Sequence, residues 1–267
     1  MNDVSLGPVV LSGPRFGVAL ALIALLVTAE VLERRGRKGV APVAWNAVVL
    51  GLLAARLGYV ALHLGTYVRA PLSALYVWQG GFDLPIGAAA AAAYAVAVLR
   101  SRRALLAGVL LAGSIGAVVW GGWQLASGPP PAPSPDVLTA GLQGLDGTQT
   151  DVKAFVGRPL VVNLWATWCG PCQRELPMLA SVAAATPGVT FLFVSQGEPQ
   201  ARVASYLKQH QLSLRHVFLD GSSALSAAVA TKGLPTTLFF DAQGKLASRW
   251  LGELSKARLA DELKRIR

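Results

Sequence analysis

The chain has 267 residues, of which 53% are hydrophobic and 14% charged, and its formal net charge is +10. This composition is too apolar for an ordinary soluble protein, and the apolar excess lies in the first half. The basic residues do not indicate nucleic-acid binding, because many form two short clusters, at 34–38 and 100–103, beside hydrophobic runs. With only two cysteines, the chain can form neither a disulfide framework nor a four-thiolate metal site.

Residues 1–126 are predicted to form an α-helical transmembrane domain of about four spans. The apolar stretches are 16–32, 42–62, 82–99 and 104–125. Each approaches the roughly 20 residues that a helix needs to cross a bilayer core. Because basic loops stay in the cytoplasm, the N-terminus and everything after residue 125 are expected outside. A cleaved signal peptide would carry its positive charge before the first stretch, whereas here the basic cluster follows it.

Arg56 lies inside the second apolar stretch. An ionisable residue within a membrane is a candidate functional residue. Alternatively, its long side chain reaches the outer interface, about two helical turns away. The sequence leaves both interpretations open.

Residues 10–125 resemble the core of prolipoprotein diacylglyceryl transferases, through Arg56-Leu-Gly-Tyr followed by Trp78-Gln79-Gly-Gly. The resemblance makes Arg56, Trp78 and Gln79 a candidate membrane-domain site. It breaks down where that family has a histidine, because Pro85 stands there and cannot act as an acid, a base or a charged donor. Four spans also fall short of the full transferase. We therefore interpret this half as a truncated, transferase-like membrane domain and do not expect transferase activity.

Residues 127–136 include five prolines and are predicted to be a linker. In a polyproline II conformation, which rises about 3.1 Å per residue, they would span roughly 30 Å. A proline-rich ligand for a partner domain is the alternative. The position at a change in composition favours a spacer.

Residues 137–267 are predicted to form an α/β domain with a central mixed sheet, since strand patterns alternate with helical ones. About 130 residues suffice for one independent core. A hairpin region is expected at 142–156, further strands at 159–165, 189–194, 215–219, 236–241 and 245–251, and helices from about 171 and at 200–211, 222–230 and 255–266.

Cys169 and Cys172 lie between the strand at 159–165 and the helix that follows it. Cys169 therefore falls at a helix N-terminus, where unpaired N–H groups and the helix dipole favour a thiolate. Pro171 suits an early helical position because it lacks an N–H. Disulfide exchange needs an exposed, low-pKa sulfur and a second sulfur that resolves the mixed disulfide. The alternative is a structural disulfide or a pair of inert thiols.

The motif Asn163-Leu-Trp-Ala-Thr-Trp-Cys-Gly-Pro-Cys-Gln-Arg-Glu-Leu-Pro177, with Gly233-Leu-Pro-Thr-Thr237 downstream, resembles the thioredoxin superfamily. Within it, the motif is similar to the membrane-tethered TlpA/ResA branch. The resemblance covers about 137–267 and implies a thioredoxin fold. It also implies that the two cysteines are redox-active and that Gly170 and Pro171, which lie between them, belong to the active-site motif. An extra helix and strand within 198–219 fit this branch.

The resemblance implies roles for five residues around the cysteines. Glu175, with Asn163 beside it, would accept the proton of the resolving thiol; the alternative is a carboxylate placed for the helix dipole. Pro235 would be cis, so that Leu234 pairs with an extended substrate; a plain turn proline is the alternative. Trp168 is expected to shield and shape the motif and to contact substrate.

We therefore expect a multi-pass protein of the bacterial inner membrane, embedded in the lipid bilayer, whose periplasmic thioredoxin-like domain reduces protein disulfides. In the superfamily, Gly-Pro between the cysteines goes with reducing enzymes. No cofactor, metal or nucleic-acid partner is expected. The membrane half contains no cysteine to carry electrons, so a separate transmembrane or periplasmic electron donor is implied. Cytochrome c maturation fits less well, because Thr236 stands where relatives in that pathway carry an acidic residue.

Three alternatives remain. The chain could be a disulfide oxidase or isomerase, since the dipeptide does not determine a redox potential. It could be a transferase-related membrane enzyme with an accessory redox domain. It could also be a redox-inert binding module. The sequence does not identify the substrate or the electron donor.

Overall fold

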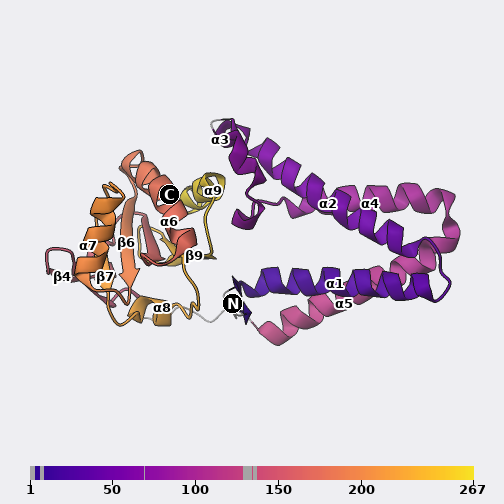
Figure 1. The fold of residues 1–267 in the computed structure, drawn as a ribbon, viewed down its shortest axis with the longest axis horizontal. Helices are drawn as coiled ribbons and strands as arrows, with labels where there is room; N and C mark the ends of the chain where they lie inside the picture. The colour runs from indigo at the N-terminus through magenta and orange to yellow at the C-terminus, as the bar shows by residue number, and fades with distance from the viewer. Residues whose placement is uncertain (1–3, 7–8, 69, 129–133, 135–136) are drawn as a thin grey trace. The chain divides into compact units, whose positions relative to one another are not determined.

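The computed structural model describes residues 4–6, 9–68, 70–128, 134 and 137–267. The chain divides into two compact units, one made mainly of residues 11–130 and the other mainly of residues 131–267 (Figure 1). Two three-residue strands that the sequence did not predict, β1 (Val4–Leu6) and β2 (Val9–Leu11), pair with each other near the N-terminus.

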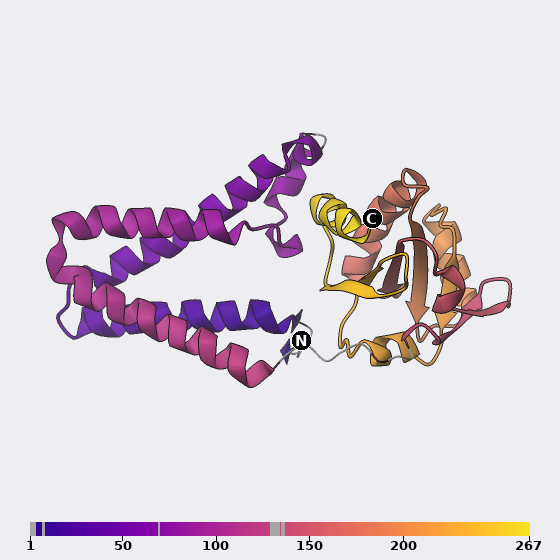
Figure 2. The ribbon, with the colours of Figure 1, turned by 180° about the vertical axis from the view of Figure 1, so that it is seen from behind.

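Four long helices make up most of the first unit: α1 (Gly13–Arg34), α2 (Val40–Leu62), α4 (Leu84–Ser101) and α5 (Leu106–Ser127). All four have the length and apolar composition of membrane-crossing helices, as predicted. Helix α1 packs beside α5 and α2 beside α4, which Figures 1 and 2 show from opposite sides. Between α2 and α4 the backbones approach closely, because a Cβ on Gly87 would lie 2.7 Å from the carbonyl oxygen of Gly51.

The connection between α2 and α4 is built from three short helical segments. These are α3 (Leu64–Tyr67), η1 (Pro71–Leu75) and η2 (Val77–Gln79), while η3 (Arg103–Leu105) precedes α5. Short helical turns leave many carbonyls without a partner inside their own segment. The connection therefore needs hydrogen-bond donors from elsewhere.

Arg56 supplies those donors. Its Nε donates to the Ala74 carbonyl at 3.0 Å, and its Nη1 donates to the carbonyls of Gly80 and Gly81 at 2.6 and 2.8 Å. Its Nη2 donates to the Ser73 carbonyl at 3.2 Å. The side chain is buried against the connection that follows α2, and its role within a membrane stays a prediction. A guanidinium has five N–H donors, and the carbonyls of the connection take four of them.

We expect Arg56→Ala to destabilise the first unit, because each half-buried carbonyl that loses its partner costs up to about 1–3 kcal/mol. Arg56→Lys should not restore stability, since an ammonium is a point charge without the planar fork that reaches four carbonyls. Thermal unfolding of the full chain in detergent measures the effect. The exposed Arg37 gives the control, Arg37→Ala. Equal melting temperatures for Arg56→Ala and the control would contradict the assignment.

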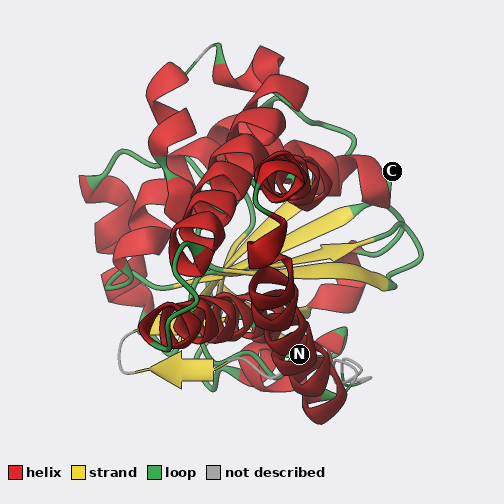
Figure 3. Cartoon of the chain, turned by 90° about the vertical axis from the view of Figure 1, so that its right-hand side faces the viewer, coloured by secondary structure: helices red, strands yellow, loops and turns green. Residues whose placement is uncertain are grey.

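The second unit is built on one seven-stranded mixed sheet of order β4-β3-β7-β6-β5-β8-β9. Strands β5, β6 and β7 are mutually parallel, and the other pairs are antiparallel. The strands are β3 (Gly141–Gly144), β4 (Gln149–Asp151), β5 (Leu160–Trp165), β6 (Thr190–Gln196), β7 (Val217–Asp220), β8 (Thr236–Phe240) and β9 (Leu246–Leu251). Figure 3 shows them fanning out as one twisted layer. The predicted α/β class with a central mixed sheet is confirmed.

Helices lie on both faces of this sheet. They are η5 (Val152–Phe155), α6 (Gly170–Ala184), α7 (Gln200–Gln209), α8 (Ala224–Ala228) and α9 (Lys256–Ile266). Residues alternate in β5, so Val161 and Trp165 join the core under α6, α7 and α9, whereas Leu160, Val162 and Leu164 join the core beside α8. Two apolar layers therefore hold β5 rigidly, and β5 leads directly into the cysteine turn.

The predicted polyproline linker lies largely outside the described residues, and its conformation stays a prediction. Helix α5 extends to Ser127, so the first residue of that predicted segment is helical.

Candidate active site

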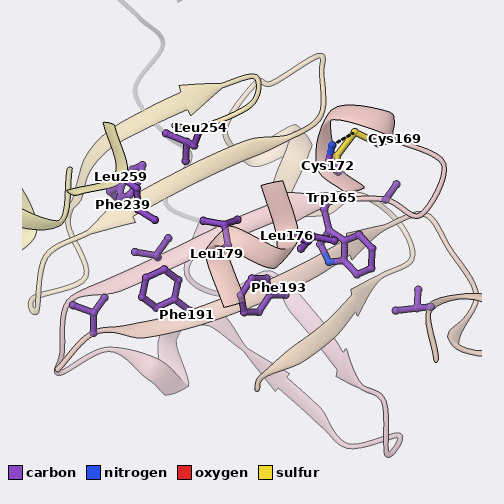
Figure 4. Close-up of a cluster of buried hydrophobic side chains, with 14 of the residues drawn as sticks. Trp165, Cys169, Cys172, Leu176, Leu179, Phe191, Phe193, Phe239, Leu254 and Leu259 are labelled. Atoms are coloured by element: carbon purple, nitrogen blue, oxygen red, sulfur yellow. Dashed lines mark hydrogen bonds between the residues drawn. A yellow bond between two sulfur atoms is a disulfide. The ribbon is translucent and has the colours of Figure 1, made fainter. Parts of the chain in front are cut away.

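The cysteine turn joins the end of β5 to the start of α6. Cys169 is the N-cap of α6, and its sulfur accepts a hydrogen bond from the Cys172 N–H at 3.3 Å, drawn as a dashed line in Figure 4. Gly170 and Pro171 occupy the first two helical positions, where the missing N–H of proline costs no hydrogen bond. The two sulfurs form a disulfide. The predicted placement at a helix N-terminus is confirmed.

Exposure distinguishes the two sulfurs less than expected. Cys169 is 5% exposed and Cys172 is 0% exposed. The prediction of an openly exposed attacking sulfur is therefore wrong for the disulfide form, because the turn packs both cysteines into the apolar cluster with Trp165 and Leu176 (Figure 4). Of the two, only Cys169 retains accessible surface, so a partner thiol or disulfide can approach that residue alone.

Trp168 and Leu234 each expose groups that a partner can contact. Trp168 is 66% exposed, so most of this residue faces solvent. The Leu234–Pro235 peptide bond is cis, as the family resemblance implied. Pro235 accepts a hydrogen bond from Gly252 N–H at 2.8 Å, whereas the Leu234 main chain has no hydrogen bond within the described part of the chain.

Glu175 is buried at 2% exposure and lies three residues after Cys172 on α6. Its Oε1 accepts from the Asn163 amide at 2.8 Å, and its Oε2 accepts from the Leu254 N–H at 2.9 Å. The same amide group of Asn163 also donates to the Thr237 hydroxyl at 3.0 Å. The predicted pairing of Asn163 with Glu175 is thus present.

Burial raises the pKa of Glu175 from 4.5 to about 8. The Leu254 N–H and the Asn163 amide act in the opposite direction, because they stabilise the carboxylate, while the nearby Glu253 carboxylate adds to the increase. At neutral pH, Glu175 in the disulfide form is therefore predominantly a neutral carboxylic acid that holds a proton one helical turn from Cys172.

The sequence did not indicate the segment that closes over Glu175. Arg174 donates to Glu253 at 2.9 and 2.7 Å, and the following residue, Leu254, contributes its N–H to Glu175. Glu253 and Leu254 lie between β9 and α9, 79 residues from their partners. No local pattern marks such a contact, so only the fold reveals it.

A second buried carboxylate, Glu198, was also missed, although a signal existed. It accepts hydrogen bonds from the N–H and the hydroxyl of Thr167, which precedes the cysteine motif. Thr167 follows β5, and Glu198 follows the adjacent parallel strand β6. The carboxyl ends of neighbouring parallel strands meet at one edge of a sheet, which would have placed the two residues together.

A site formed by the three candidate residues of the first unit stays a prediction. Arg56 uses its donors on backbone carbonyls, Trp78 is exposed, and Gln79 is half-buried. Across the described residues, no three His, Cys, Asp or Glu side chains are grouped to hold a metal ion. The arrangement in the second unit can carry out thiol-disulfide exchange with its own residues.

Comparison with known proteins agrees with this chemistry. Residues 131–263 match the family model described as Redoxin. The thiol-disulfide oxidoreductase ResA of Geobacillus thermodenitrificans is 29% identical over 136 residues, which cover 50% of this chain and 76% of the relative. ResA of Bacillus subtilis is 26% identical over 128 residues, which cover 47% and 71%. The solved structure of MTB dsbF in its mixed oxidized and reduced forms is 25% identical with a TM-score of 0.47, covering 50% of this chain and 99% of that chain.

The second unit of this chain is therefore a Redoxin domain, with ResA-like thiol-disulfide oxidoreductases among its homologues.

Proposed function

We propose that this chain is a membrane-anchored thiol-disulfide oxidoreductase that reduces protein disulfides on the periplasmic side of a bacterial inner membrane. One observation carries the proposal: the Cys169–Cys172 disulfide lies at the start of α6, and a protonated, buried Glu175 lies one turn further on. A purely structural disulfide has no need of a proton-holding carboxyl group beside it. The ResA-type relatives support the same chemistry.

In the reduced protein, the Cys169 thiolate attacks one sulfur of a substrate disulfide and forms a mixed disulfide, which releases the other substrate sulfur as a thiolate. Cys172 then loses its proton and attacks the Cys169 sulfur. This step breaks the mixed disulfide, releases the second substrate thiolate and forms the intramolecular disulfide. Two electrons pass to the substrate. A separate electron donor must return them to the Cys169–Cys172 pair, because the chain has no other cysteine.

Glu175 moves the proton of the buried thiol. When Cys172 attacks, its proton passes to the Glu175 carboxylate, and this leaves the neutral acid that burial favours in the disulfide form. When the donor reduces the disulfide, the same proton returns to the Cys172 thiolate. The proton on Glu175 thus avoids an unpaired buried charge in the oxidised state.

The substrate strand lies along Leu234 in this proposal. The free main-chain groups of Leu234 can pair with an extended peptide, and the exposed side chain of Trp168 offers apolar surface to the same partner. Such contacts recognise backbone and shape, which suits a substrate class of unfolded or extended chains.

The four long apolar helices support membrane anchoring. Basic residues 34–38 and 100–103 follow α1 and α4, and placing them in the cytoplasm puts the Redoxin domain outside. The resemblance of residues 10–125 to diacylglyceryl transferases stays a prediction. We assign that unit an anchoring role and no lipid-transfer step.

Cys172→Ala is expected to accumulate mixed disulfides between Cys169 and its substrates, because the resolving attack is lost. Affinity capture of the full chain, followed by release with a reductant, identifies the trapped proteins. The matched control is Cys169→Ala, which retains the buried sulfur and should trap none. Equal yields from the two variants would exclude Cys169 as the attacking residue.

Glu175→Gln is expected to weaken the pH dependence of stability in the oxidised protein. Between about pH 4.5 and 8, folded wild-type protein holds a proton that unfolded protein has lost, so its free energy of unfolding falls as pH rises through this window. The slope is at most about 1.4 kcal/mol per pH unit. Unfolding the wild type and the variant at pH 5.5 and 8.5 compares the two slopes.

Glu262→Gln serves as the control for this experiment. Glu262 is also buried, but its partners are Ser248 in β9 and Arg258 in α9, and neither belongs to the cysteine motif. It measures how much of any change in stability comes from removing a buried, hydrogen-bonded carboxylate as such. If the free energy of unfolding depends on pH equally in wild type and Glu175→Gln, Glu175 is not the proton-holding group. A proton role further requires that Glu175→Gln slow substrate reduction by about tenfold or more.

Alkaline phosphatase fused after residue 128 is expected to be active in a bacterial host, since this enzyme matures only outside the cytoplasm. The same fusion within 100–103 should be inactive. The reverse pattern would place the cysteines in the cytoplasm and rule out the proposed location. The midpoint potential of the Cys169–Cys172 pair separates a reductase from an oxidase or isomerase.

A further inference from the structure

Every polar group of Thr167 forms a hydrogen bond. It lies two residues before Cys169, in the turn between β5 and α6. Its N–H donates to Glu198 Oε2 at 2.8 Å, its hydroxyl donates to Glu198 Oε1 at 2.5 Å, and its carbonyl accepts from Gln173 Nε2 at 2.6 Å. The turn that delivers Cys169 is therefore fixed from two directions.

Glu198 is buried, and its carboxylate accepts hydrogen bonds from this turn and from the neighbouring strand β6. In addition to Thr167, it accepts a hydrogen bond from the Ser195 hydroxyl at 2.9 Å. Ser195 is the register partner of Trp165, the last residue of β5. Within the described part of the chain, none of the side chains bonded to Glu198 is a cation. A buried carboxylate without a counter-ion depends on such hydrogen bonds, and charge-assisted bonds are stronger than neutral ones.

We propose that Glu198 is a positioning residue for disulfide exchange: by holding Thr167, it fixes the turn that places the Cys169 sulfur at the start of α6 and turns Trp168 toward solvent. This inference rests on the proposed function and extends it to a residue outside the Cys-Gly-Pro-Cys and Leu-Pro motifs.

Thr167 affects the reactivity of Cys169 through the N-terminus of α6. The Cys169 sulfur accepts a hydrogen bond from the Cys172 N–H, and the same contact stabilises a thiolate in the reduced protein. That contact requires the backbone before Cys169 to keep its path. If Thr167 were released, the sulfur would spend less time at the helix terminus, its pKa would rise, and the fraction of reactive thiolate would fall.

A competing explanation is that Glu198 acts by its negative charge alone. Charge acts in the opposite direction, because a nearby carboxylate destabilises a thiolate and its removal would lower the pKa of Cys169. Glu198→Gln separates the two effects. Glutamine loses the charge but keeps an oxygen for the Thr167 N–H, whereas Glu198→Ala loses both the charge and the hydrogen bonds.

The test is the rate of Cys169 alkylation by iodoacetamide as a function of pH, in the reduced full chain in detergent, with peptide mass analysis to identify the modified residue. For Glu198→Ala we expect the Cys169 pKa to rise by about one unit and the rate near neutral pH to fall about tenfold. For Glu198→Gln we expect a rate within about threefold of wild type. Thr167→Val should lower the alkylation rate less than Glu198→Ala does. The two effects should not add in the double variant, since both substitutions break the same contact.

Glu262→Ala is the matched control, because it removes another buried, hydrogen-bonded carboxylate away from the cysteine turn. It should lower thermal stability and leave the alkylation profile unchanged. The proposal is overturned if Glu198→Ala alkylates as wild type does, if both Glu198 variants lower the Cys169 pKa, or if Glu262→Ala shifts the profile equally. If Glu198→Ala does not fold, Thr167→Val alone decides, and a wild-type profile for it overturns the proposal.

Reduction of insulin disulfides by the same proteins distinguishes failure of this inference from failure of the proposed function. A wild-type chain that is alkylated with a low pKa but reduces no disulfide would refute the reductase assignment. The response of the alkylation profile to Glu198 would still be measurable in that case.

Discussion

The hydrogen bonds of the buried Glu175 carboxyl group bring together three parts of the chain that are far apart in sequence. Asn163 comes from the central strand β5, Glu175 from α6, and Leu254 from the connection between β9 and α9. A carboxyl group at this depth is tolerated only if its oxygens find donors and its charge can be neutralised by a proton. The fold supplies both conditions, so the chemistry of the cysteines depends on the long-range closure of the domain and not only on the motif.

The cysteine turn is controlled from both ends. On the side of β5, Glu198 and Gln173 hold Thr167. On the side of α6, the Arg174–Glu253 ion pair and the Leu254 N–H hold the second turn of the helix. Only the short stretch from Trp168 to Cys172 lies between these anchors. A rigid frame around a small exposed surface is the arrangement expected for a site that must present one sulfur while the other stays covered.

Patterns of short range predicted most of this architecture. The four apolar stretches and the alternation of strands and helices depend on local hydrophobic periodicity, and the cysteine spacing depends on helix-terminus geometry, so both could be predicted from the residues. The exposure of Cys169 could not, because burial depends on side chains such as Trp165 that pack against it in three dimensions. The contacts of Glu253 and Leu254 could not be predicted either, since nothing near these residues in the sequence indicates a partner 79 residues away.

The carbonyl clamp formed by Arg56 has a consequence for how the first unit can change through evolution. Its contacts are with main-chain oxygens, so they do not depend on which side chains residues 71–80 carry. Gly81 is constrained differently: its φ is +80°, and an added Cβ would lie 2.6 Å from the Arg56 guanidinium. Two fixed positions thus leave the side chains of residues 71–80 free to vary without loss of these contacts.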